Sequence, residues 1–117
     1  MEAFFDCQDL EYSLLEHLVN EALYYEHNDF VIWVLNSPHS SKIPINGMNS
    51  WASILISAAR GGSQQVVRAI MLSPYFSKIN KNGIGISSAI QAAQHDRHFE
   101  IAEEIKAHYQ KILSSNL

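Results

Sequence analysis

Apolar and polar residues follow a helical period in the first third of the chain. In the segment LEYSLLEHLVNEALYY, apolar side chains recur every three or four residues, which predicts an amphipathic helix from residue 9 to about residue 26. Asn28 and Asp29 can turn the chain and cap a second helix, FVIWVLN. This helix is apolar nearly all round, so we expect it to be buried, with Trp33 in the core.

The same order of elements then follows twice more. Residue 37 precedes a proline and should end the second helix, and Ser73-Pro74 should end the fourth in the same way. Between these stops, SWASILISAARGGSQQVVRAIML predicts a helix to Arg60 capped by Ser50 or Ser53, a turn at Gly61-Gly62, and a helix capped by Ser63. The third round, GISSAIQAAQHDRHFEIAEEIKAHYQKIL, has no proline stop, and its last helix should run to about Leu113.

The connectors between the helix pairs are duplicated. SPHSSKIPINGM begins at Ser37 and SPYFSKINKNGI begins at Ser73, with seven identities in twelve positions. Both contain an Asn-Gly turn dipeptide. A period of about 34 to 36 residues is typical of stacked helical hairpins. The sequence therefore predicts one all-α domain over residues 1–117, with approximate repeats 9–47, 48–83 and 84–117.

Residues 58–71, AARGGSQQVVRAIM, resemble the ankyrin-repeat pattern A-A-x-x-G-H-x-x-V-V-x-x-L-L position for position, apart from Ser63, where the family has His. SILIS stands where the family has T-P-L-H-x. The third round fits if Ala92-Ala93 matches Ala58-Ala59 and one extra residue lies near Asp96 and Arg97, while the first round keeps Ala22-Leu23. The resemblance covers residues 48–108 best. It implies a solenoid of about three stacked ankyrin-like helix-turn-helix repeats.

The resemblance also implies a binding surface, because ankyrin proteins bind other proteins through the loop tips and the exposed face of each first helix. Carried over by position, this strip comprises Lys42, Asn46, Met48, Trp51, Ser57, Arg60, Lys78, Lys81, Asn82, Ile84, Gln91 and Gln94. Trp51 is either an exposed anchor of the kind that dominates interface energetics or a side chain that folds back over the helix ends. Tyr24, Tyr25 and His27 either extend the strip or cover the first turn.

Composition and charge indicate which kinds of partner the chain could bind. The chain has 117 residues, 47% of them hydrophobic and 17% charged, which suits one domain with a core. Residues 1–41 carry eight acidic residues and no Lys or Arg, a charge of −8, and the remainder carries eight basic and four acidic residues, a charge of +4. Basic residues spread over so many positions form no phosphate-tracking stripe, so we expect no nucleic-acid partner.

The chain is expected to be cytoplasmic, with secretion as an effector left open. Its longest apolar runs, such as residues 30–35, are far shorter than the roughly 20 residues of a membrane span, and its N-terminus is acidic where a signal peptide is basic. The single cysteine, Cys7, forms no internal disulfide, which agrees with a reducing compartment.

Candidate chemistry is sparse. His95 and His98 have the i, i+3 spacing of two metal ligands, yet no Cys, Asp or Glu pattern completes a set, so we expect solvated or capping histidines and no metal or cofactor. Cys7 is the only nucleophile we would name, and it lies in no recognisable motif. No phosphate loop, paired-carboxylate signature or G-x-S-x-G occurs, and we expect no catalysis.

Three hypotheses follow. The leading one is a protein-protein interaction module that acts as an inhibitor, adaptor or regulator; by analogy with short repeat proteins of bacterial effector systems, its partner could be an effector enzyme. The second is self-assembly into a homodimer through the acidic first unit and the basic later units. The third is a cysteine-dependent enzyme that uses Cys7.

Overall fold

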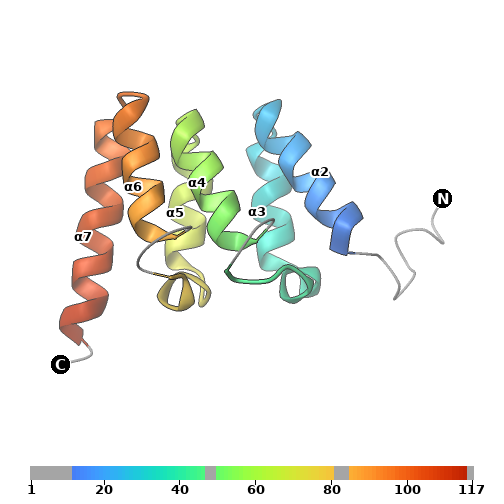
Figure 1. Cartoon of the computed structure of the whole chain (residues 1–117). Coiled ribbons are helices and arrows are strands. Elements are labelled where there is room, and N and C mark those ends of the chain that lie inside the picture. Colours follow the sequence, from blue (N-terminus) through green and yellow to red (C-terminus); the bar gives the residue numbers. More distant parts are fainter. Residues whose placement is uncertain (1–11, 47–49, 81–84, 116–117) are drawn as a thin grey trace.

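The part of the chain that the structure describes folds into three pairs of helices that lie side by side (Figure 1). The computed structural model describes residues 12–46, 50–80 and 85–115, and in these ranges it contains α-helices, two 3₁₀ turns and no strand. Helices α2, α4 and α6 form a front layer, and α3, α5 and α7 form a back layer. The elements are α2 (Tyr12–Tyr24), α3 (Asn28–Asn36), η1 (Pro38–Lys42), α4 (Trp51–Gly61), α5 (Gln64–Leu72), η2 (Phe76–Lys78), α6 (Ile86–His95) and α7 (Phe99–Ser115).

One turn geometry joins the front and back helix of all three pairs. A backbone amide donates to a carbonyl five residues earlier: His27 to Ala22 (2.7 Å), Ser63 to Ala58 (2.9 Å) and His98 to Ala93 (2.7 Å). The residue before each donor adopts a left-handed conformation: Glu26 (φ 62°), Gly62 (φ 79°) and Arg97 (φ 68°). This is the Schellman-type helix end, which satisfies the last carbonyls of the front helix.

These hydrogen bonds correct the register expected for the third pair. Ala93, not Ala92, is the equivalent of Ala58, because the two carbonyls accept the same turn bond. No extra residue lies near Asp96 and Arg97. The difference in length lies in the connectors, since the carbonyl of Pro44 accepts from the amide seven residues later and that of Asn80 from the amide six residues later. Equivalent residues are therefore 36 apart between the first two pairs and 35 apart between the last two.

The serines that begin the two duplicated connectors make the same contacts. Ser37 Oγ donates to the Val34 carbonyl (2.8 Å), and Ser73 Oγ donates to the Ile70 carbonyl (2.7 Å). Each serine hydroxyl also accepts from the amide two residues later. The predicted stops are confirmed, since α3 and α5 end directly before these serines. What the sequence did not predict is that each connector then forms a 3₁₀ turn.

The predicted helix starts are confirmed in part. Ser50 caps α4, because its hydroxyl accepts from the amide of Ser53 (3.2 Å). Ser63 occupies the cap position of α5, but its side chain makes no capping hydrogen bond. His27, not Asn28 or Asp29, occupies the cap position of α3.

The core lies between the two layers and continues under the connectors. Alanines on the front helices are buried, which lets neighbouring helices approach closely as expected. The back helices contribute a repeated set of buried positions: Val31, Val34 and Leu35; Val66, Val67, Ile70 and Met71; Ile101, Ala102 and Ile105.

Trp33 does not belong to this core, contrary to the expectation from its apolar surroundings. Its side chain is 58% exposed and stacks on Phe30, with ring centroids 6.1 Å apart. A helix that is apolar all round needs neighbours on every side. Helix α3 belongs to the first pair, and among the described residues no further pair precedes it.

Candidate protein-binding surface

The repeated register places four positions of each front helix on the same solvent-facing side. We call this the front face; its residues are His17, Asn20, Glu21 and Tyr24 on α2, Ser53, Ile56, Ser57 and Arg60 on α4, and Ser88, Gln91, Ala92 and His95 on α6. Most of these side chains are exposed or half-buried, and the buried exception is Ala92. Ser53, Ser57, Ser88 and Ala92 are short, while the larger Tyr24, Arg60 and His95 stand at the carboxyl ends of the helices.

A hollow of about 430 Å³ opens on this face between α2 and α4. We call it the front hollow; it is lined by Asn20, Leu23, Tyr24, Glu26, Ser57, Arg60, Gly61 and Ser63. Tyr24 is 79% exposed, and Arg60 is exposed and has no ion pair with any residue that the structure describes. An aromatic ring and a free guanidinium thus stand at one opening.

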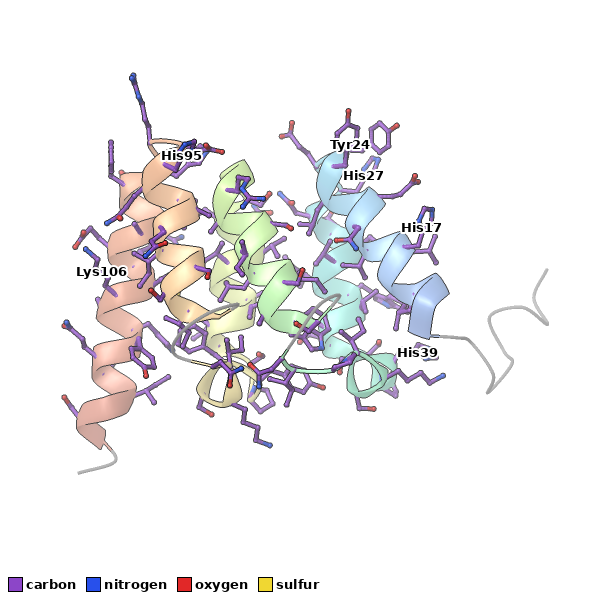
Figure 2. The ribbon with its side chains drawn as sticks, in the orientation of Figure 1. His17, Tyr24, His27, His39, His95 and Lys106 are labelled. Carbon is purple, nitrogen blue, oxygen red and sulfur yellow. The ribbon has the colours of Figure 1, made fainter. Side chains whose placement is uncertain are left out.

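Equivalent residues continue this row toward α6. Tyr24, Arg60 and His95 occupy the same position at the carboxyl ends of the three front helices. Figure 2 shows Tyr24 and His95 at the same end of the molecule. His95 Nδ1 lies 3.0 Å from Asp96 Oδ1, so that carboxylate can accept a hydrogen bond from the imidazole.

Trp51, the anchor candidate, is not on this surface. Its side chain is fully buried, its indole Nε1 donates to the Ser40 carbonyl (3.0 Å), and its rings stack on Tyr75 with centroids 5.7 Å apart. Of the two readings left open by the sequence, the structure therefore shows the one in which Trp51 folds back and seals the helix ends. It is a core residue, and we no longer count it as part of the binding strip.

The side chain of Asn46 also forms hydrogen bonds within the fold. Its Nδ2 donates to the Lys78 carbonyl (2.9 Å), and its Oδ1 accepts from the amide of Asn80 (2.6 Å). The side chain therefore ties the first connector to the second. Lys42 and Lys78 lie in the 3₁₀ turns, with Lys42 half-buried and Lys78 exposed, at the end of the molecule away from the front hollow.

The other strip candidates divide into three groups. Ser57, Arg60 and Gln91 belong to the front face, but Gln94 takes the position of the buried Ala59 and is exposed at the flank of α6. The strip candidates Met48, Lys81, Asn82 and Ile84 lie outside the described residues, as does the candidate nucleophile Cys7. The sequence missed the contribution of Asn20 and Glu26 to the hollow; the signal was available, since Asn20 and Tyr24 stand 36 residues before Ile56 and Arg60.

One ion pair crosses the back layer. Arg68 on α5 donates from Nε (3.1 Å) and Nη2 (2.6 Å) to the Glu104 carboxylate on α7, which also accepts from Gln64 (3.0 Å). The hydrogen bonds from Arg68 hold the pKa of Glu104 below its ordinary value, against the opposing effect of burial. This pair fastens the second helix pair to the third.

The two histidines of the metal hypothesis have separate surroundings. His95 contacts Asp96, and the His98 ring lies over Gly62 of the preceding turn. Within the described ranges, no group of three or more His, Cys, Asp or Glu side chains is placed to hold a metal ion. None of the helices in those ranges is long and apolar enough to cross a membrane.

Comparison with known proteins gives no relative. No family model, no curated protein and no solved structure matches this chain.

Proposed function

We propose that this chain is an ankyrin-like helical-repeat protein whose activity is to bind another protein through its front face. The observation that carries the proposal is the front hollow, whose lining contains the exposed side chains of Tyr24 and Arg60 from neighbouring helices, with no ion pair between Arg60 and any described residue. Tyrosine and arginine are the residue types enriched among interface hot spots. Three helix pairs in one register repeat the same positions on α2, α4 and α6, which lie side by side (Figure 1).

The rest of the front face suits a bound chain rather than a small molecule. Its middle is built from Ser53, Ser57 and Ser88, which leave room above the helices, and polar ends border it. A repeat protein gains area by presenting equivalent positions from successive repeats, so specificity comes from a few larger side chains. Binding then serves as the output of the protein, as an inhibitor, adaptor or regulator, with an effector enzyme as one partner class.

The test is capture of a partner by the tagged chain and by matched variants. Tyr24→Ala and Arg60→Glu change exposed side chains, so the fold should survive. The amount of partner captured by the double variant should fall at least about tenfold, as for hot-spot residues. Lys106→Glu is the control, because it makes the same charge reversal on exposed α7 at the cost of one weak pair with Glu103. Equal capture by all variants would refute the front face, and loss in Lys106→Glu alone would move the interface to α7.

A further inference from the structure

The stack of helices has an open end at its first pair. Leu18 and Phe30 are half-buried, whereas their equivalents 36 residues later, Ile54 and Val66, are 1% and 0% exposed. In the second pair, these positions are covered by the pair before it. Among the described residues nothing covers them in the first pair, so an apolar surface remains there.

This surface forms a hollow of about 410 Å³, which we call the end hollow. Leu18, Ala22 and Phe30 provide apolar contacts, and Glu21, Tyr25 and His27 complete the lining. Tyr25 is 62% exposed, and its ring is held edge-on against Tyr24 at 4.9 Å between centroids. The end hollow therefore lies next to the front hollow, with the two tyrosines between them.

The lining of the end hollow contains the carboxylate of Glu21 and no lysine or arginine. Glu21 is more than half exposed, and its carboxylate lies 3.8 Å from His17 Nε2. No lysine or arginine occurs before Lys42 in the sequence, and the acidic residues Glu26 and Asp29 are also exposed. An incoming cation would therefore meet a carboxylate in the lining of the end hollow, while Arg60 belongs to the lining of the neighbouring front hollow.

Lysine and arginine side chains match these features. Their aliphatic stems cover apolar surface while the charged head stays at the rim, and the head can pair with a carboxylate or lie on an aromatic ring. We propose that the end hollow binds a lysine or arginine side chain of an exposed basic segment of the partner protein. This inference rests on the proposed protein-binding function. The stem packs on Leu18 and Phe30, and the head lies between Glu21 and Tyr25.

Other occupants fit the charge less well. Residues 1–11 of the chain carry Glu2, Asp6, Asp9 and Glu11 and no cation, so their charge has the same sign as that of the hollow. An uncharged apolar peptide would shield Glu21 from water without supplying an opposite charge. A second copy of the chain does supply cations from its later repeats, and the experiment separates that case.

The experiment uses the full chain and fluorescein-labelled octalysine and octaarginine, with octaglutamate as the negative probe, followed by fluorescence anisotropy at low salt. We expect the two cationic probes to bind and octaglutamate not to bind. Glu21→Gln and Tyr25→Ala should each weaken binding by about threefold or more, the size of one exposed ion pair or cation–π contact. Glu103→Gln makes the same change in net charge on α7 and should leave the affinity within about twofold. Amide NMR shifts caused by octaarginine should centre on residues 18–30.

Three results would overturn the inference: no binding of either cationic probe, equal weakening by Glu103→Gln, or shifts centred elsewhere. Sedimentation of the chain without probe tests the remaining occupant, which is a second copy of the chain. If the chain self-associates and Glu21→Gln abolishes the association, the occupant is a second copy and the assignment to a partner is wrong. A captured partner that is sensitive to Tyr24→Ala with Arg60→Glu but not to Glu21→Gln would refute the end hollow and leave the proposed function intact.

Discussion

The indole of Trp51 donates its N–H to the backbone carbonyl of Ser40, 3.0 Å away, across eleven residues of sequence. Ser40 Oγ is in turn 2.7 Å from the Tyr75 hydroxyl, and the Tyr75 ring stacks on Trp51. The start of α4 is thereby joined to both 3₁₀ turns. Trp51 holds the repeats together from inside.

Replacing Trp51 should therefore unfold the chain rather than weaken binding selectively. Trp51→Ala should lower the free energy of unfolding by about 3–5 kcal/mol, as for a large buried aromatic residue. Trp51→Phe keeps much of the apolar volume and should cost less, with the Ser40 carbonyl losing its donor. Urea denaturation followed by circular dichroism measures both. A Trp51→Ala variant as stable as the parent would contradict the burial.

Asn46 should behave as a structural link between connectors. Asn46→Ala removes one donor and one acceptor, and about 1–2 kcal/mol of stability should be lost, at about 0.5–1.5 kcal/mol for each hydrogen bond. Asn46→Asp retains the acceptor for the Asn80 amide but sets a carboxylate oxygen against the Lys78 carbonyl, so it should also lower stability. Equal urea midpoints for Asn46→Ala and the parent would show that the link contributes nothing.

Two adjacent glycines give a matched test of the second turn. Gly62 has a φ of 79°, and a Cβ there would lie 2.7 Å from the His98 ring, so Gly62→Ala should destabilise the fold by about 1–3 kcal/mol. Gly61 ends α4, and a Cβ there would meet nothing within 4 Å. Gly61→Ala should be neutral or stabilising by up to about 1 kcal/mol. Thermal unfolding of the two variants compares them directly, and the opposite order would refute the turn geometry.

Acid should weaken the connection between α5 and α7. Because the pKa of Glu104 is lowered in the folded chain, its contribution to stability is present above the ordinary value of 4.5 and is lost as the pH falls through the lowered value. Glu104→Gln should therefore reduce the urea midpoint at about pH 7. It should also reduce the difference between the urea midpoints measured at about pH 7 and about pH 3. Glu103→Gln, which leaves Arg68 paired, is the control. An unchanged difference in Glu104→Gln would mean that this carboxylate contributes nothing to acid sensitivity.

Local signals in the sequence predicted the helices well. Ser37-Pro38 and Ser73-Pro74 end their helices because proline acts on its own neighbours, and Gly62 marks a turn that needs positive φ. The other two turns use Glu26 and Arg97 in the same conformation, and the side chains of these residue types do not favour it. These two turns were therefore recognised only from the hydrogen bonds to Ala22 and Ala93.

The candidate site was harder to predict because burial depends on distant parts of the chain. Trp51 is covered by connectors that lie before and after it, and Trp33 stays exposed because of its place at the end of the stack. Both tryptophans were therefore open to misassignment from local pattern alone. Arg60 was predicted on the binding strip by position in the ankyrin pattern, and its exposure agrees with its place on the polar side of an amphipathic helix.

The central claim is that a partner protein lies on the front face. A photo-crosslinking amino acid placed at Ser57, beside the front hollow, should trap a partner protein, and the same group at Gln65 on exposed α5 should not. Both positions are exposed, so neither substitution should disturb the fold, and circular dichroism can verify this. A crosslinked species from position 57 that disappears in Arg60→Glu is the predicted result. Crosslinks from position 65 alone, or none from position 57 while a partner remains bound, would contradict the account.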